Sequence, residues 1–253
     1  MISIKNKSSI QKMEEAGSLL SGLFEDLGSL MQAGVATAEI DAWIATELTK
    51  RGLVSRMKGY MGYQHVSCIS LNNEVVHGIP SSGRKLKDGD FLTVDVCASY
   101  KGYCADMARQ FFIGEPKPEA KRLADVAQKS LDAAIAKAVV GNRLSDISAA
   151  VQQVVEQAGF GVVRDFAGHG IGKQMHEDPE ILNYGAPGQG PVLRSGMAFA
   201  IEPMITAGNY EVYVTADGWT VCTEDNSLAA HVEDTVVITD SGPKVITRNP
   251  VRR

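Results

Sequence analysis

The sequence predicts an α+β protein made of two similar halves, each with two helices followed by strands. Apolar residues repeat at helical spacing in residues 8–34 and again beyond Pro118, whereas β-branched and aromatic residues dominate 60–113 and the C-terminal stretch. The order helices, strands, helices, strands suggests an internal duplication. Adding one constant number to the residue numbers of the first half aligns it with the second half. This constant shift aligns Asp95 with Glu202, and both acids have apolar neighbours in the sequence.

Composition limits the class of protein. The chain has 253 residues, 44% of them hydrophobic and 22% charged, which is enough for one large domain with a substantial core. Its net charge is −5 without a block of like charges, so we expect no DNA partner and no membrane anchor. The start MISIKNKSSI lacks the apolar core of a signal peptide, and the four cysteines lack C-x2-C spacing. We therefore expect a cytoplasmic protein with free thiols.

The first half begins with two predicted helices. A capping box from Ser8 to Gln11 predicts the start of the first helix, and Gly34 its end. The second helix is expected at about 38–50, stopping at Gly52. Strand-like stretches such as FLTVDV then fill residues 60–113.

The second half repeats this order. Pro118 opens a long helix, a shorter helix runs from Ser145 to Gly159, and the chain then becomes strand-like to its end. The constant shift pairs the following positions: Gly34 with Gly141, Gly52 with Gly159, Gly89 with Gly196, and Asp95 with Glu202. We expect one catalytic domain over 1–253, with halves of about 1–115 and 116–253 and a site between them.

A predicted hairpin in TVDVCASYKGYCADMARQF offers two candidate metal pairs. If Lys101-Gly102 is a two-residue turn, Cys97 lies opposite Asp106, and Asp95 becomes a diagonal neighbour of Asp106. The same register places Cys97 and Cys104 on one face, and a turn of odd length changes the faces. Periodicity alone therefore leaves both the aspartate pair and the cysteine pair open.

Features elsewhere in the chain favour the aspartates over the cysteines as metal ligands. Carboxylates in apolar strands are costly unless a cation neutralises them, and we expect no lysine or arginine beside them within the strand cores. His169 lies between two glycines that let the backbone pack closely. Four carboxylates and one imidazole suit two divalent ions such as Co, Mn, Fe(II) or Zn. The set is Asp95, Asp106, His169, Glu202 and Glu233.

The sequence gives weaker indications about the roles of the remaining candidate residues. His77 fits a core hydrogen bond as well as a functional role, whereas His65 and His231 are interpreted as structural. Cys97 and Cys104 are interpreted as small buried packing residues. The aromatic residues Trp219 and Tyr63 are typical of a core on sequence alone.

These residues resemble type I methionine aminopeptidase, in the pita-bread metallopeptidase superfamily. The resemblance covers nearly the whole chain and rests on NNEVVHGIP, KDGDFLTVDV, CADMARQF, GHGIG followed by MHEDP, SGMAFAIEP and DGWTVCTEDNSLAAHVEDT. It implies the creatinase/aminopeptidase-like fold, with two pseudo-symmetric α/β halves around a central antiparallel sheet. The five metal ligands of the family fall on the five residues reached above from chemistry.

The resemblance also implies roles for individual residues. Asp106 and Glu233 would bridge two metal ions, Asp95 would bind one ion, and His169 and Glu202 the other. His77 would approach the amide or leaving nitrogen of the substrate, and His176 would stabilise the oxygen of the tetrahedral intermediate. The methionine pocket would draw on Tyr60, Tyr63, Cys68, Trp219, Met57 and Met175.

The implied activity is removal of the initiator methionine from nascent proteins and peptides with small second residues. Two divalent ions would activate a water molecule, and Glu202 would carry its proton to the leaving amine. The expected partners are the N-termini of nascent polypeptides, with the ribosome as one place of encounter. We expect a monomer.

Three positions depart from the family pattern, namely Val76, Met175 and Asp234. The stretch VEDTVVIT is similar to the proline-specific relatives, so an Xaa-Pro aminopeptidase or dipeptidase is the first alternative. A non-catalytic peptide-binding relative is the second alternative, although all five ligand positions keep metal-binding residue types.

Overall fold

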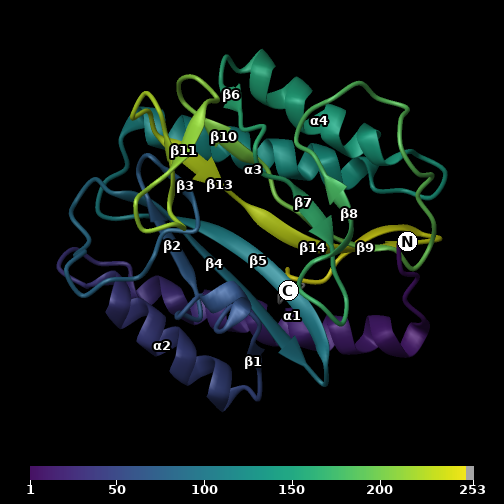
Figure 1. Ribbon diagram of the computed structural model, residues 1–253, viewed down its shortest axis with the longest axis horizontal. Helices are drawn as coiled ribbons and strands as arrows, with labels where there is room; N and C mark the ends of the chain where they lie inside the picture. The colour runs from purple at the N-terminus through teal and green to yellow at the C-terminus, as the bar shows by residue number, and fades with distance from the viewer. Residues whose placement is uncertain (249–253) are drawn as a thin grey trace.

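The computed structural model describes residues 1–248 and shows helices above and below a long curved sheet (Figure 1). The helices are α1 Lys7–Leu27, α2 Thr37–Lys50, α3 Pro118–Lys137 and α4 Leu144–Gln157, with short 3₁₀ turns η1 Gly28–Leu30 and η2 Tyr60–Gly62. The strands are β1 Val54–Ser55, β2 Cys68–Leu71, β3 Glu74–Val76, β4 Phe91–Tyr100, β5 Tyr103–Phe112, β6 Gly161–Val162, β7 Gly168–Gly170, β8 Glu177–Ile181, β9 Ala198–Ile201, β10 Met204–Thr206, β11 Val212–Val214, β12 Val221–Thr223, β13 Ala229–His231, β14 Glu233–Thr239 and β15 Gly242–Val245.

The first helix differs from its prediction at both ends. Its N-cap is Asn6, whose side-chain oxygen accepts a hydrogen bond from the backbone N–H of Ser9 at 2.9 Å, so the predicted capping box at Ser8 is wrong. Asn6 has extended backbone angles, as an N-cap requires, whereas Ser8 already lies inside the helix. The helix ends at Leu27 and tightens into η1. Gly34 instead forms the later turn, with φ of 93°.

The other helices start and end near their predicted positions. Pro118 occupies the first turn of α3, where its missing N–H costs no helical hydrogen bond. The constant shift predicted between the halves relates α2 to α4 at both ends, and it relates β1 to β6 as well. The N-terminus of α2 is capped by Glu39, whose carboxylate accepts from the N–H of Ala36 at 2.7 Å. At the start of α4, the carboxylate of Asp146 accepts from the backbone N–H of Arg143 at 2.8 Å.

The main sheet joins the two halves. Its strand order is β1-β4-β5-β14-β9-β7-β8, with β2 also paired to β4 and β15 to β14. The pairings within it are antiparallel. The strand β5 of the first half pairs directly with β14 of the second half. The predicted fold class is confirmed: the chain has an α+β pita-bread fold around a central antiparallel sheet.

Each pair of helices buries its own apolar cluster against the sheet. Leu20 and Ile40 pack with Val94 of β4 in the first cluster, and Leu123 packs with Phe199 of β9 in the second. Each such side chain contributes about 1.5–3 kcal/mol when it is removed from water. None of the helices within residues 1–248 is both long enough and apolar enough to cross a membrane.

Candidate metal centre

The hairpin of β4 and β5 presents two carboxylates as diagonal neighbours. Lys101 and Gly102 form its two-residue turn with φ of 49° and 80°. Positive φ at both central residues matches the type I′ turn, whose twist suits paired antiparallel strands. The resulting register sets Cys97 opposite Asp106 and leaves Asp95 diagonal to Asp106. The register predicted from a two-residue turn is thus confirmed.

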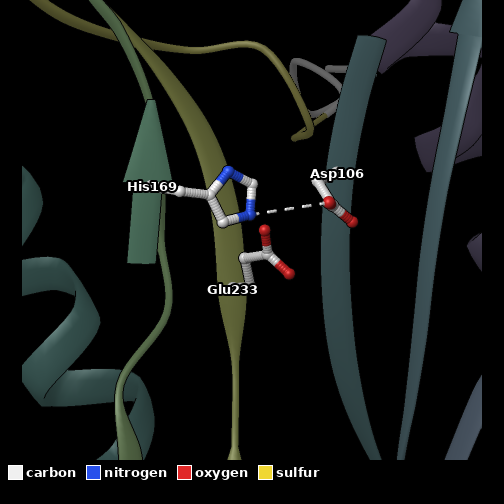
Figure 2. A group of neighbouring side chains, drawn as sticks. All are labelled: Asp106, His169 and Glu233. Carbon is white, nitrogen blue, oxygen red and sulfur yellow. Dashed lines mark ion pairs between the residues drawn. The ribbon is translucent and has the colours of Figure 1, made fainter. Parts of the chain in front are cut away.

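The second half brings three more donors to this face of the sheet. Glu233 starts β14, which lies between β5 and β9. His169 is the central residue of β7, which pairs with β9, and Glu202 directly follows β9. Figure 2 shows His169 of β7, Glu233 of β14 and Asp106 of β5 close together. Residues far apart in the sequence therefore converge because their strands belong to one sheet.

The distances are those of a compact donor cluster. One donor atom from each of Asp106, His169 and Glu233 lies within 4.8 Å of the others. The Nε2 atom of His169 is 4.0 Å from Oδ2 of Asp106 and 3.5 Å from Oε1 of Glu202 (Figure 2 shows the first pair). A divalent ion with ligand bonds of about 2.0–2.2 Å spans such separations.

Local backbone chemistry orients His169. Its Nδ1 lies 3.0 Å from the carbonyl oxygen of Gly170, so a proton on Nδ1 donates to that oxygen and the lone pair of Nε2 faces the carboxylates. The flanking glycines are required by close packing. A Cβ on Gly168 would lie 2.5 Å from the carbonyl oxygen of Ala200, and one on Gly170 would lie 2.0 Å from that of Asp178.

Burial makes the acids of the cluster hard to ionise unless a cation is present. Desolvation raises the pKa of Asp106 to about 7 and that of Glu202 to about 8. The pKa values of Asp95 and Glu233 are raised well above their ordinary values, first by burial and then by the charge of Asp106. Burial also lowers the pKa of His169 to about 3, which keeps its imidazole neutral and able to donate a lone pair.

The donor set fits divalent metal ions. Oδ1 of Asp106 and Oε1 of Glu233 are buried oxygens that have no hydrogen-bond donor within residues 1–248. An ionised carboxylate can only accept, so buried oxygens of this kind require a cation or a proton. Carboxylates with one neutral imidazole are typical ligands of Mn, Fe, Co or Zn.

Arg109 corrects one expectation from sequence. It lies in the core of β5, three residues from Asp106, although we expected no basic residue there. Its side chain belongs to the other side of the sheet, since Nη2 donates to Oδ1 of Asp234 at 2.6 Å. The acids of the cluster therefore gain no ion pair from Arg109, and they still require a cation to neutralise them.

Asp234 is the centre of a polar network behind Glu233. Its side chain is fully buried, and Oδ1 accepts from Arg109 and from Oγ1 of Thr247 at 2.8 Å. Oδ2 accepts from Nε of Arg248 at 2.6 Å. The C-terminal end of the described chain is thereby tied to the strand that carries Glu233. This departure from the family pattern is thus a satisfied, ion-paired side chain.

A cavity of about 1240 Å³ opens beside the cluster, and every site residue expected from sequence lines it. The five acid and imidazole donors line it together with His77 and His176. Burial, then the nearby imidazoles, lower the pKa of His77 to about 4, and φ of this residue is 60°. Nδ1 of His176 lies 2.9 Å from the hydroxyl oxygen of Tyr60, and its ring is 4.3 Å from that of His169.

An apolar wall forms another part of the cavity. The rings of Tyr63 and Trp219 lie 5.0 Å apart, and the Tyr63 hydroxyl donates to the carbonyl oxygen of Ser67 at 2.9 Å. Cys68, Met57 and Met175 are buried and line the same space. Trp219 and Tyr63, typical of a core by sequence alone, thus face the cavity. Tyr60 is 40% exposed and contacts His176.

Two residues beside the site escaped the sequence reasoning. His231, interpreted there as structural, is 2% exposed with Nε2 3.5 Å from Oε2 of Glu202. Phe166 stands edge-on to His77, with ring centroids 5.7 Å apart. The alternation of a strand offers a signal for the first, because His231 precedes Glu233 by two residues and side chains two apart share a face. We find no comparable signal for Phe166.

The cysteines take no part in the cluster. All four are free and buried, and Cys97 and Cys104 are 1% and 0% exposed within the first apolar cluster. Burial raises the pKa of the Cys97 thiol well above its ordinary range, whereas a hydrogen bond with Cys97 lowers the pKa of Cys104. The compact group of donors found within residues 1–248 contains Asp106 and no cysteine.

Comparisons with known proteins agree with this geometry. The model of Metallopeptidase family M24 matches residues 11–240. A methionine aminopeptidase from Clostridium acetobutylicum is 48% identical, with 98% of this chain and 99% of that protein covered. One from Escherichia coli is 41% identical, with 97% and 94% covered.

Solved structures show the same likeness. A crystal structure of methionine aminopeptidase from Thermotoga maritima superposes with a TM-score of 0.96 at 40% identity, covering 98% of this chain and 100% of that one. A prolidase from Pyrococcus furiosus shares the fold with a TM-score of 0.80 at 22% identity, covering 98% of this chain and 66% of that one.

Proposed function

The chain belongs to metallopeptidase family M24, among its methionine aminopeptidases, and from this premise we propose that it removes the N-terminal methionine from nascent proteins and peptides. The proposal rests on one observation. Asp106, His169 and Glu233 converge beside a cavity that is also lined by apolar, sulfur-containing and aromatic side chains. Hydrolysis of the peptide bond after an N-terminal methionine requires a metal-binding cluster beside an apolar pocket.

Two divalent metal ions fit the donors. Asp106 and Glu233 would bridge them, Asp95 would bind one ion, and His169 with Glu202 the other. When bound, such ions lower the pKa of a water molecule and polarise the scissile carbonyl group. The buried oxygens of Asp106 and Glu233 that lack hydrogen-bond donors support this assignment. Mn, Fe(II), Co and Zn all suit the ligand types.

Glu202 is the proton carrier in the proposed reaction. Burial raises the pKa of its carboxyl group to about 8 in the absence of a cation. A bound cation favours the ionised carboxylate, which can then take a proton from water. Delivery of that proton to the leaving nitrogen completes the cleavage of the peptide bond. His77, kept neutral by burial, would hydrogen-bond this nitrogen from the cavity wall.

His176 would stabilise the negative charge that develops on the substrate oxygen. The Tyr60 hydroxyl lies 2.9 Å from Nδ1 of His176, which leaves Nε2 as the nitrogen free to bind substrate. If the tyrosine donates to Nδ1, the imidazole proton resides on Nε2, and that N–H can donate to the oxyanion. Tyr60 thus serves His176 in addition to lining the pocket.

The apolar wall would receive the methionine side chain. Tyr63, Trp219, Cys68, Met57 and Met175 offer aromatic and sulfur contacts that suit a flexible thioether. Substrate residues after methionine would lie toward the open end of the cavity, where small second residues meet the least obstruction. We further propose a single catalytic domain built from halves 1–115 and 116–253 that acts as a monomer in the cytoplasm, meeting nascent chains at the ribosome.

A peptide panel tests the proposal. The purified protein is incubated with Met-Ala-Ser, Met-Leu-Ser and Ala-Pro peptides in the presence of Mn, Co, Fe(II) or Zn, and free amino acids are measured. We expect methionine release from Met-Ala-Ser, much less from Met-Leu-Ser, and none from Ala-Pro. Cleavage of Ala-Pro in preference to Met-Ala-Ser would favour the proline-specific alternative. Metal binding without release of any amino acid would favour the non-catalytic alternative.

A further inference from the structure

His231 lies beside the metal-binding cluster without an assigned role. It ends β13, where it pairs with Met204 of β10, and it precedes Glu233 by two residues. Its side chain is 2% exposed, and its backbone oxygen accepts from Oγ1 of Thr93 at 3.1 Å. These contacts hold the backbone of His231 between the two halves, so the position of its ring is fixed by packing.

The ring nitrogen faces one oxygen of Glu202. Nε2 of His231 is 3.5 Å from Oε2, whereas Nε2 of His169 is 3.5 Å from the other oxygen, Oε1. The carboxylate of Glu202 therefore lies between two imidazoles, with one imidazole at each oxygen. Since His169 is a proposed metal ligand, the two oxygens of Glu202 have different surroundings.

The Nε2 atom of His231 is buried and has no hydrogen-bond partner within residues 1–248. A buried N–H is rarely left without an acceptor in a folded protein. Oε2 of Glu202 is the acceptor in reach, and a shift of the flexible glutamate side chain by a few tenths of an ångström makes a hydrogen bond of ordinary length. The unpaired nitrogen therefore points to Glu202 as its partner.

We propose that His231 is a positioning residue, whose Nε2–H donates to Oε2 of Glu202 and so directs Oε1 toward His169 and the cavity. This inference rests on the proposed function, in which Glu202 is both a metal ligand and the proton carrier. A fixed donor at Oε2 selects one rotamer of Glu202 and so holds the carboxylate ready for a cation at its other oxygen. Asp95 and His77 are the other titratable groups whose charge couples to His231.

Two amide substitutions separate this role from simple packing. The amide nitrogen of glutamine is as many bonds from Cα as Nε2 of histidine, so His231→Gln keeps a donor toward Glu202. The amide nitrogen of asparagine corresponds to Nδ1 instead, so His231→Asn loses that donor, as does His231→Leu. The matched control is His65→Gln, because His65 pairs with Asp41 and lies outside the cavity.

The measurements are Mn binding by titration calorimetry without peptide, and kcat and KM for Met-Ala-Ser. We expect His231→Gln and His65→Gln to bind Mn within about threefold of the original protein. His231→Leu and His231→Asn should lose roughly 10–100-fold in Mn affinity, in kcat, or in both, with KM changed little. Circular dichroism verifies folding, and the glutamine–asparagine contrast remains if the leucine variant does not fold.

Two results would overturn the inference. One is a folded His231→Leu variant whose Mn affinity and kcat both equal those of the original protein. The other is a folded His231→Gln variant as impaired as His231→Asn, which would mean that the donor at Nε2 is irrelevant. Because Mn affinity is measured without peptide, the inference can stand even if the original protein fails to release methionine, so the two failures are distinguishable.

Discussion

The two halves of the molecule share a backbone frame but contribute different chemistry to the site. The constant shift that relates α2 to α4 at both ends also relates Asp95 to Glu202. Each half contributes two carboxylates, but the first half also contributes most of the apolar wall, whereas the second half contributes His169 and His231 around Glu202. The repeated frame therefore places Asp95 and Glu202 at matching positions, and the neighbours of these two acids differ.

The contrast continues in the two strands that meet at the centre of the sheet. The residue after Asp106 is Met107, which is 1% exposed and packs in the apolar core. The residue after Glu233 is Asp234, which is 0% exposed and held by two arginines. The two proposed bridging ligands are thus supported differently, one by apolar packing and the other by an ion network. The residues that follow the two proposed bridging ligands therefore need not tolerate the same substitutions.

The largest effect is expected from the acids at equivalent positions. Glu202→Gln should lower kcat for Met-Ala-Ser by roughly 10²–10⁴-fold even at saturating metal, because it removes the proposed proton carrier. Asp95→Asn should weaken metal binding by roughly tenfold or more, with kcat largely restored at high metal concentration. The measurement is kcat as a function of Mn concentration. Equal losses of kcat at saturating Mn would contradict different roles for the two acids.

The next effect tests the network behind Glu233. Asp234→Asn should reduce the free energy of unfolding by about 3 kcal/mol, because it leaves two arginines without their buried counter-charge. The control is Asp132→Asn, whose partner Arg248 makes an exposed ion pair at 2.8 Å, and which should cost less than about 1 kcal/mol. Urea denaturation measures both. A loss at Asp234 no larger than at Asp132 would mean that the network does not stabilise this half.

The smallest effect tests whether the halves share one backbone frame energetically. Gly52 and Gly159 follow α2 and α4 with φ of 68° and 76°, and an added Cβ would meet no atom closer than 3.8 Å at either position. Gly52→Ala and Gly159→Ala should therefore each cost about 1–2 kcal/mol from backbone conformation alone. Urea denaturation is again the measurement. If the free energies of unfolding of the two variants differ by more than the expected loss of about 1–2 kcal/mol, the two halves respond differently at matching turns.

Short-range features of the fold could be predicted from sequence because short-range forces fix them. A turn of Lys101 and Gly102 sets a register in which Cys97 lies opposite Asp106. Pro118 marks the first turn of α3 because its ring fits only there. The N-cap of α1 was predicted two residues late because Ser8 and Asn6 are both good capping residues. Local chemistry alone did not decide between them.

The residue types along the chain were enough to indicate which side chains could hold a metal, because buried acids without counter-charge require a cation. It could not place Arg109, whose side chain turns to Asp234 on the opposite side of the sheet. Nor could it show that His231 reaches Glu202, since β13 and β9 lie far apart along the chain. These contacts became visible only in the folded chain, because pairing of distant strands sets which faces meet, and local propensity carries no information about that pairing.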